Sequence, residues 1–295
     1  MKWQQTLSNR PVGTIHMQEV SVIVLTKNSE KLLDDCLKSI VKNEPSEIII
    51  IDDGSTDRTL EICKQYTDQI YHNGKGIAFG RQLGAEKANK EYIAYVDSDV
   101  ILPENFFGRM LIEKKEKGYH AIQAQTLSMK NGTYWQLCAD KIQESDNVPR
   151  EQGWVGTTAT IFDRDIVLKY KFDPLIPSSE DGELSFRLKK AGYKLGRGSV
   201  RVLHLHRQNF KGWKKQRIWR GKGKAQFIYK YKFTFQSART FVNPALVAVC
   251  SPLLALKHGQ PRLFPYILLD GIFQEIGLLQ ELAGLLIKGK HTIGY

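Results

Sequence analysis

Two carboxylates stand one residue apart at the end of an apolar run, in the sequence YVDSDV at residues 95–100. If the run is a strand that continues through both acids, Asp97 and Asp99 point the same way and can face one ligand. Two close carboxylates repel each other unless a cation lies between them. Hard oxygen ligands at an open site suit Mg²⁺ or Mn²⁺. The motif predicts a divalent metal site, although a polar strand end with Asp99 capping a turn fits the same residues.

Acidic residues occur at two further places. In IIDDGS (50–55) they end an apolar run, and in SSED (178–181) they follow two serines. Asp53 can cap a helix that follows it. Ser178 and Asp181 fit a capping box, and acids in a first helical turn suit the helix dipole. Each site therefore has a structural interpretation beside a chemical one.

Strand-like and helix-like segments alternate along the first two thirds of the chain. The predicted strands are residues 20–26, 47–53, 69–73, 91–99, 121–128, 157–165 and 199–206. The predicted helices are residues 30–43 (capped by Asn28 or Ser29), 54–67, 76–89, 134–145 and 178–192. Over the first four strands this alternation predicts a parallel α/β sheet. Ligands bind at the carboxyl ends of such strands, so the acids of 50–55 and 95–100 are expected to converge on one crevice.

The charge of the chain is unevenly distributed. The formal net charge is +12, and no acid occurs between Glu183 and Asp270, a stretch that holds 19 Lys and Arg. Such a block predicts an anionic partner: nucleic acid, phospholipid head groups or a phosphorylated substrate. The four cysteines show no paired spacing, which argues against a zinc site or disulfide framework and favours a reducing compartment. Residues 1–18 lack the apolar core of a signal peptide.

Five motifs occur in order and at suitable spacing: VSVIVLTKN, IIDDGSTDRT, NGKGIAFGRQLGAEKA, YIAYVDSDVILP and SSEDGELSFRLKKAGY. Together they resemble the inverting nucleotide-sugar glycosyltransferases of family 2, over roughly residues 20–205. The resemblance implies a GT-A (Rossmann-like) fold, with a mixed sheet flanked by helices. It divides the chain into an N-terminal extension (1–19), a catalytic domain (20–205) and a basic, amphipathic helical region (206–295).

The resemblance also implies roles for individual residues. The residues implied to bind the nucleotide sugar are Leu25, Thr26, Asn28, Asp53, Lys75, Arg81, Asp97 and Ser98. The implied metal ligands are Asp97 and Asp99, with His204 or His206 as a further ligand. The implied ion is Mn²⁺ or Mg²⁺. Asp53 can still be a helix cap, Arg81 a solvated helix residue, and either histidine a buried neutral one.

The acid pair Glu180–Asp181 matches the catalytic pair of the family, in which the Asp is the general base. Direct displacement at the anomeric carbon needs one base to take the proton of the acceptor hydroxyl. Trp154 is expected to shape the acceptor site, or else to lie in the core. The order of residues in QRIWRGKG (216–223) departs from the Q-x-x-R-W of processive relatives.

The C-terminal segments 241–256 and 263–287 are apolar but poor membrane spans, since the first is short and broken by prolines and the second carries acids. Segment 263–287 can form one apolar face, from Ile267, Leu268, Ile272, Phe273, Ile276, Leu279, Leu282 and Leu286. That pattern suits a helix lying in a membrane interface. Packing on the catalytic domain, or a dimer contact, is the alternative.

These observations predict a metal-dependent inverting glycosyltransferase that moves a sugar from a nucleotide diphosphate to a hydroxyl, on a lipid-linked or other glycan acceptor. We expect it at the cytoplasmic face of the cell membrane, bound to anionic lipid through its C-terminal region, with no nucleic acid as partner. A polyprenyl-phosphate sugar synthase is the alternative within the family. A basic nucleic-acid-binding protein on an α/β fold is the alternative from another class.

Overall fold

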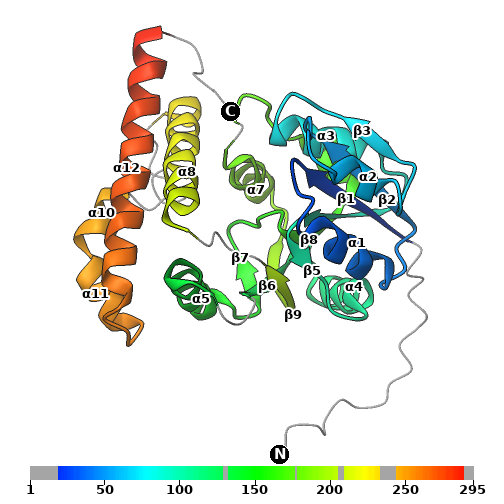
Figure 1. Cartoon of the computed structure of the whole chain (residues 1–295), viewed down its shortest axis with the longest axis horizontal. Helices are drawn as coiled ribbons and strands as arrows, with labels where there is room; N and C mark the ends of the chain where they lie inside the picture. Colours follow the sequence, from blue (N-terminus) through cyan, green and yellow to red (C-terminus); the bar gives the residue numbers. More distant parts are fainter. Residues whose placement is uncertain (1–18, 129–131, 177, 205–208, 233–243, 289–295) are drawn as a thin grey trace, which may run out of the picture.

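The computed structural model describes residues 19–128, 132–176, 178–204, 209–232 and 244–288. An α/β domain forms one side of the molecule, and the helices after residue 208 lie together on the other side (Figure 1). Most of the predicted N-terminal extension and the candidate ligand His206 lie outside the described residues, as do residues 241–243 of the first apolar segment.

The described strands form one nine-stranded mixed sheet with the order β3-β2-β1-β4-β8-β6-β9-β5, and β7 pairs with β9. Their bounds are β1 Val20–Thr26, β2 Glu47–Asp52, β3 Ile70–His72, β4 Tyr92–Asp97, β5 Val100–Ile101, β6 Ala121–Ser128, β7 Arg150–Gln152, β8 Ala159–Asp163 and β9 Leu195–His204. Strands β1 to β4 pair in parallel, whereas β8 runs antiparallel to both β4 and β6. The purely parallel arrangement expected from the first four strands therefore holds only there, and the mixed sheet implied by the resemblance is confirmed.

The helices of the α/β domain cover both faces of this sheet. They are α1 Leu33–Val41, α2 Thr59–Cys63, α3 Ile77–Lys87, α4 Phe106–Lys117, α5 Tyr134–Asp146, α6 Arg164–Tyr170 and α7 Glu180–Lys190. In β1, Val22 and Val24 belong to a core shared with α1 and α4, while Ile23 belongs to a second core shared with α3 and α7. This is the two-residue alternation of a strand buried on both sides.

Three predicted helix caps are wrong. Helix α1 starts at Leu33 after an N-cap at Leu32 and has no side-chain cap, so neither Asn28 nor Ser29 caps it. Helix α2 follows Arg58 without a side-chain cap, and helix α7 follows Ser179 without one. Short polar side chains at these positions bond to other segments instead: Asn28 accepts from the Thr56 backbone and Ser178 donates to the Trp219 carbonyl, alternatives that sequence spacing cannot distinguish from a cap.

The C-terminal helices are α8 Phe210–Tyr231, α10 Pro244–Val249, α11 Ser251–Lys257 and α12 Leu263–Lys288. They share a core with α5, formed around Trp213, Tyr266 and Cys138. Arg217 of α8 forms an ion pair with Asp270 of α12, with Nε and Oδ1 2.8 Å apart, and donates to the hydroxyl of Tyr266. Within the part of the chain that the structure describes, no helix is both long and apolar enough to cross a membrane.

Candidate functional site

The carboxyl ends of β4 and β9 bring three potential metal ligands together. Strand β4 ends at Asp97, and Asp99 lies in the turn before β5 rather than on the strand. Strand β5 then pairs with β9 so that Val100 is opposite His204. As a result, the Nε2 atom of His204 lies 3.4 Å from Oδ1 of Asp99. The turn and the strand pairing, not strand alternation, put the ligands together.

One ligand atom from each of Asp97, Asp99 and His204 lies within 4.8 Å of the other two. Adjacent ligands of an octahedral ion with bonds of about 2.1 Å stand about 3 Å apart, so small rotations would bring these atoms around one ion. Burial raises the pKa of Asp97; the charge of Arg81 opposes this, Asp99 adds to it and His204 opposes it. A divalent cation would relieve the repulsion between the two carboxylates.

Arg81 links this cluster to the start of α7. Its Nη2 atom lies 3.6 Å from Oδ1 of Asp97, and its Nη1 atom forms an ion pair with Glu180. Both Arg81 and Glu180 are buried, so Arg81 is not a solvated helix residue. The expected contact of Arg81 with the donor diphosphate stays a prediction, and the contact with Asp97 puts Arg81 at the same cluster.

Asp181 and Trp154 both lie next to Gly156. A Cβ atom placed on Gly156 would be 3.5 Å from Oδ2 of Asp181 and 3.5 Å from Cζ3 of Trp154. Gly156 is held by its backbone N–H, which donates to Oε1 of Gln123 on β6. Trp154 is 48% exposed, so the alternative of a core tryptophan is wrong. The proposed base and the proposed acceptor residue are therefore neighbours, as an acceptor site requires.

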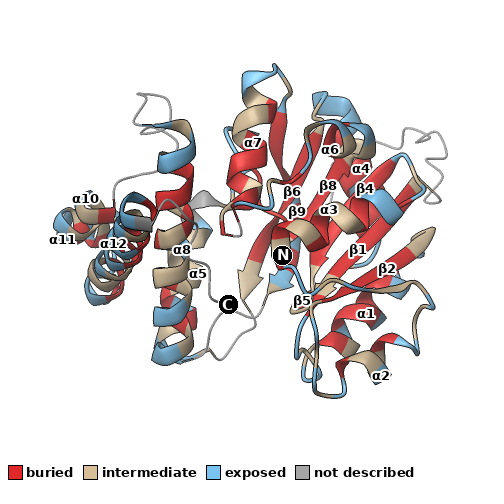
Figure 2. Cartoon of the chain, turned by 90° about the horizontal axis from the view of Figure 1, so that it is seen from above, coloured by how far each residue is buried: buried red, intermediate tan, exposed pale blue. Residues whose placement is uncertain are grey.

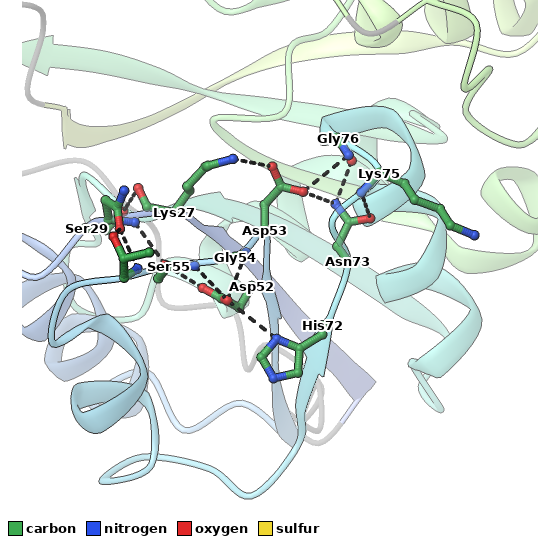
Figure 3. A network of polar contacts seen from close by, with 12 residues as sticks. Lys27, Ser29, Asp52, Asp53, Gly54, Ser55, His72, Asn73, Lys75 and Gly76 are labelled. Carbon is green, nitrogen blue, oxygen red and sulfur yellow. Dashed lines mark hydrogen bonds and ion pairs between the residues drawn. The ribbon is translucent and has the colours of Figure 1, made fainter. Parts of the chain in front are cut away.

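A second group of polar residues lies at the carboxyl end of β2 (Figure 3). Oδ1 of Asp53 accepts hydrogen bonds from the Asn73 side chain and the Gly76 backbone, and Oδ2 pairs with Lys27. The neighbouring Asp52 is fully buried and accepts from the backbone of residues 54 and 55. Asp53 therefore connects the loop of residues 73–76 to Lys27 in the loop after β1. The alternative that Asp53 caps α2 is wrong.

The remaining predicted nucleotide-binding residues lie along these loops. Asn28 has a φ of 50° and its side-chain oxygen accepts from the Thr56 backbone. Lys75 is exposed, with Nζ 4.7 Å above the Phe79 ring. Ser98 shares a hydrogen bond of 3.0 Å with Ser29. Leu25 is half-buried and Thr26 is buried at the end of β1. Their expected contacts with a nucleotide stay predictions.

Sequence reasoning missed Asp140, on α5. Burial raises the pKa of Asp140, while hydrogen bonds from Ser128 and the charge of His204 lower it. Ser128 is the strand partner of His204 in the pairing of β6 with β9. The charge of His204 acts on Asp140, which makes Asp140 a candidate for orienting this histidine, as carboxylates commonly do for metal-binding histidines. No motif marks it, because it comes from a helix 64 positions before the histidine it approaches.

The chain's sequence matches a known family over the region that carries this site. Residues 21–164 match the profile described as "Glycosyl transferase family 2". Over these residues the chain belongs to glycosyl transferase family 2. The match spans β1 to β8 and includes the Asp97 and Asp99 motif, whereas the Glu180–Asp181 pair and His204 lie beyond it.

Curated relatives agree with this assignment. Glycosyltransferase GlyG of Streptococcus pneumoniae is 37% identical over 107 residues, which cover 33% of this chain and 36% of the relative. The poly(ribitol-phosphate) beta-N-acetylglucosaminyltransferase TarS of Staphylococcus aureus is 35% identical over 94 residues, or 28% of this chain and 16% of the relative. The chain thus matches about a third or less of the length of these relatives.

A solved structure extends the likeness to most of the chain. The mannosyltransferase PcManGT from Pyrobaculum calidifontis, in complex with GDP-Man and Mn²⁺, aligns with a TM-score of 0.64. The alignment covers 90% of this chain and 87% of that one, at 15% sequence identity. The family 2 domain described here therefore has the GT-A fold, and its neighbours include a protein that holds a nucleotide sugar.

Proposed function

We propose that this chain is a metal-dependent inverting glycosyltransferase that moves a sugar from a nucleotide-diphosphate donor to a hydroxyl acceptor. The observation that carries the proposal is the cluster of Asp97, Asp99 and His204, joined through Arg81 to Glu180 next to Asp181. The three clustered residues offer a cation site for a diphosphate, and Asp181 offers a carboxylate that can take a proton.

The donor set fits a divalent metal. Two carboxylates and one imidazole suit Mn²⁺, and carboxylates also suit Mg²⁺. When bound there, the ion would offset the negative charge that builds on the leaving diphosphate. The structural neighbour PcManGT holds Mn²⁺ together with GDP-Man, which supports Mn²⁺ as the first ion to test.

Asp181 supplies the general base. The acceptor oxygen forms a bond to the anomeric carbon, and the bond between that carbon and the diphosphate oxygen breaks. The electron pair leaves with the diphosphate, and the hydroxyl proton passes to the Asp181 carboxylate. Attack from the face opposite the leaving group inverts the anomeric centre. Glu180, whose carboxylate pairs with Arg81, positions that arginine rather than taking the proton.

The acceptor is expected at a membrane, because helix α12 has a second apolar face besides the one in the protein core. Tyr266 and Ile267 are buried in that core, and Glu281 is buried where it accepts a hydrogen bond of 2.9 Å from Gln226 of α8. Other apolar residues of α12 face outward, with Leu279 57% exposed and Ile287 81% exposed. Burying carboxylates while exposing aliphatic side chains is costly in water. The arrangement favours lipid around the outer face of α12.

Helices α10 and α11 extend this apolar surface. Their exposed aliphatic residues are Leu246, Val249, Leu253 and Leu256. Figure 2 shows the exposed positions of α10, α11 and α12 at the end of the molecule opposite the sheet. The basic excess between Glu183 and Asp270 would add attraction to anionic lipid. We therefore propose a peripheral or monotopic enzyme at the cytoplasmic face of the membrane, acting on a lipid-linked glycan.

Two alternatives have specific tests. For nucleic-acid binding, aromatic side chains would have to stack on bases, but Trp213 and Phe227 of α8 are buried, and its exposed Phe210 and Tyr229 lie toward opposite ends of the helix. For a polyprenyl-phosphate sugar synthase, the acceptor phosphate is itself the nucleophile and needs no base, so Asp181 would matter little.

A thermal-shift screen of nucleoside diphosphates, with and without Mn²⁺, tests the proposal. A ligand at a hundredfold excess over its Kd raises the free energy of unfolding by about 2.7 kcal/mol. We expect one nucleotide to stabilise the wild type only with metal, and Asp99→Ala to lose this effect. Glu116→Ala, which removes an exposed carboxylate from α4, is the control and should keep it. If no nucleotide shifts the melting temperature under any condition, the proposal is wrong.

A further inference from the structure

Helix α8 runs directly past the start of the catalytic helix. The Ser178 hydroxyl donates a hydrogen bond of 2.9 Å to the Trp219 carbonyl. One turn later, a Cβ atom on Gly223 would be only 2.2 Å from the Ser178 carbonyl oxygen, so the two backbones are in contact. Arg220 belongs to this turn of α8, three positions from Gly223. Its side chain therefore leaves the helix close to the segment that carries Glu180 and Asp181.

Arg220 differs from Arg217 and Lys230, two other cations of α8, in having no ion-pair partner among the described residues. Arg217 is buried against Asp270 and Tyr266, and Lys230 pairs with Asp173 and Glu183. Arg220 is exposed and makes no hydrogen bond or ion pair with any residue that the structure describes. A guanidinium so placed has all its donors available for an external anion.

Two further cations of α8, Arg217 and Lys224, lie near Arg220. Desolvation by the surrounding protein atoms lowers the pKa of Arg220 to about 10, and the charge of Arg217 lowers it further, against the charges of Asp270, Tyr266 and Asp181. Lys224 follows one turn later on the same face. Desolvation lowers its pKa to about 8, opposed by Asp270 and assisted by Arg220 and Arg217. Cations crowded together in this way are stabilised when an anion binds between them.

We propose that Arg220, assisted by Lys224, binds a phosphate group on the acceptor, so that the hydroxyl deprotonated by Asp181 belongs to a phosphate-bearing molecule. A guanidinium matches phosphate in a two-point fork, which a single ammonium cannot do. Asp181 is among the groups whose charge acts on Arg220, whereas Arg81, Asp99 and His204 act on Asp97. We therefore assign Arg220 to the acceptor and the cluster of Asp97, Asp99 and His204 to the donor. This inference rests on the proposed function.

The test measures phosphate binding by the full-length protein without nucleotide and with a metal chelator present. Under these conditions Asp97 and Asp99 repel anions from the donor subsite. The soluble probe is inorganic pyrophosphate, titrated by calorimetry. The lipid probes are phosphatidylcholine vesicles containing either phosphatidic acid, a phosphomonoester, or phosphatidylglycerol, a phosphodiester of similar charge.

We expect Arg220→Gln to weaken pyrophosphate binding roughly tenfold to a hundredfold, or to abolish the preference for phosphatidic acid over phosphatidylglycerol. Arg220→Lys, which keeps the charge but loses the fork, should recover part of the effect. Lys215→Gln is the matched control, because this exposed lysine lies five positions away on another face of α8 and should change neither result. A response to pyrophosphate points to a soluble phosphate-bearing acceptor, and a response limited to vesicles points to a lipid phosphate.

The inference is overturned if the wild type binds neither probe, if Arg220→Gln binds both as the wild type does, or if Lys215→Gln weakens binding equally. Circular dichroism melting of each variant separates loss of binding from loss of fold. A wild type that shows metal-dependent nucleotide binding but no phosphate response dependent on Arg220 would refute this inference alone. A wild type with no nucleotide binding would refute the proposed function instead.

Discussion

At the scale of single residues, replacing the proposed base Asp181 is expected to separate donor binding from chemistry. Its carboxylate lies against Gly156, and the ion pair that fixes this region is made by Arg81 and Glu180, not by Asp181 itself. Asp181 is likewise not among the candidate metal ligands Asp97, Asp99 and His204. Donor binding and the fold of the site should therefore survive its replacement.

We expect Asp181→Asn to lower the transfer rate by about 10²–10⁴-fold, because the amide cannot accept the hydroxyl proton. Metal-dependent stabilisation by the nucleotide should stay as in the wild type. The measurement is a single-turnover transfer assay beside the thermal-shift screen. A variant that transfers at nearly the wild-type rate would favour an acceptor that needs no base, as in a polyprenyl-phosphate sugar synthase.

At the scale of elements, a buried charge network joins the end of α8 to α7. Glu183 of α7 is fully buried and contacts Arg187, Lys230 and Tyr231 at distances of 2.5–2.8 Å. Burial raises the pKa of Glu183, but the hydrogen bonds from these three side chains outweigh it, and the pKa lies below its ordinary value of 4.5. The network thus holds the helix that carries Arg220 against the helix that carries Asp181.

Glu183→Gln should lower the free energy of unfolding by about 1–3 kcal/mol near neutral pH, since it removes the charge of the buried carboxylate that pairs with the partly exposed Arg187 and Lys230. Because the folded-state pKa is depressed, the contribution of Glu183 is complete above pH 4.5 and is lost as pH falls through the folded-state pKa. Urea denaturation of both proteins at about pH 7 and about pH 4 measures this. Glu144→Gln, which breaks an exposed pair with Lys141, should change stability by less than about 1 kcal/mol.

Helices α8 and α12 approach each other through glycines. A Cβ atom on Gly221 would lie 2.0 Å from the Gln274 carbonyl oxygen, and one on Gly277 would lie 2.0 Å from the Ile218 carbonyl oxygen. Neither backbone can yield without separating the helices. We expect Gly221→Ala to lower the free energy of unfolding by about 1–3 kcal/mol despite its better helix propensity.

The control for Gly221→Ala is Lys222→Ala, at the neighbouring half-exposed position. Chemical denaturation should show a change within about 0.5 kcal/mol for that variant. If Gly221→Ala is as stable as the wild type, α8 and α12 do not pack as closely as described, and the buried polar contacts between them lose their support.

At the scale of the whole molecule, the apolar surface of α10 to α12 and the candidate site at the sheet belong to elements that are packed together through α5 and α8. Helix α5 packs on α8, α11 and α12, while its Asp140 approaches His204 of the metal cluster. A lipid surface that contacts α10 to α12 would therefore be separated from the proposed acceptor site by α8 (Figure 1). This arrangement suits a soluble donor and a membrane-bound acceptor.

We expect the full-length protein to sediment with anionic vesicles, and the double variant Val249→Asp with Leu253→Asp to bind at least about tenfold more weakly, since each buried aliphatic side chain contributes about 1.5–3 kcal/mol. These residues are 78% and 70% exposed, so the fold should tolerate the change. The control is Val41→Asp, at an exposed position on α1 in the α/β domain. Equal binding by the double variant and the wild type would rule out this surface as the membrane contact.

The sequence alone determined the local elements and the chemical types at the site. Apolar runs of strand length and segments of helical spacing predicted β1, β2, β6 and α7 to within about two residues, because these signals come from burial of near neighbours in the chain. The ordered motifs identified the family, and with it the pair Asp97 and Asp99 and the pair Glu180 and Asp181. The strand predicted at 157–165 contains β8, but its antiparallel direction was not predicted, and neither was helix α4.

Tertiary structure decided which of these groups meet. The pairing of β5 with β9 brings His204 to Asp99, and the ion pair with Glu180 turns Arg81 toward Asp97. Whether Asp53 caps a helix or holds a loop, and whether Trp154 is core or surface, depends on partners twenty or more residues away. The outward apolar face of α12 also depends on α8, because only the partner helix determines which side of an amphipathic helix is covered. Spacing along one segment cannot specify contacts that a distant segment supplies.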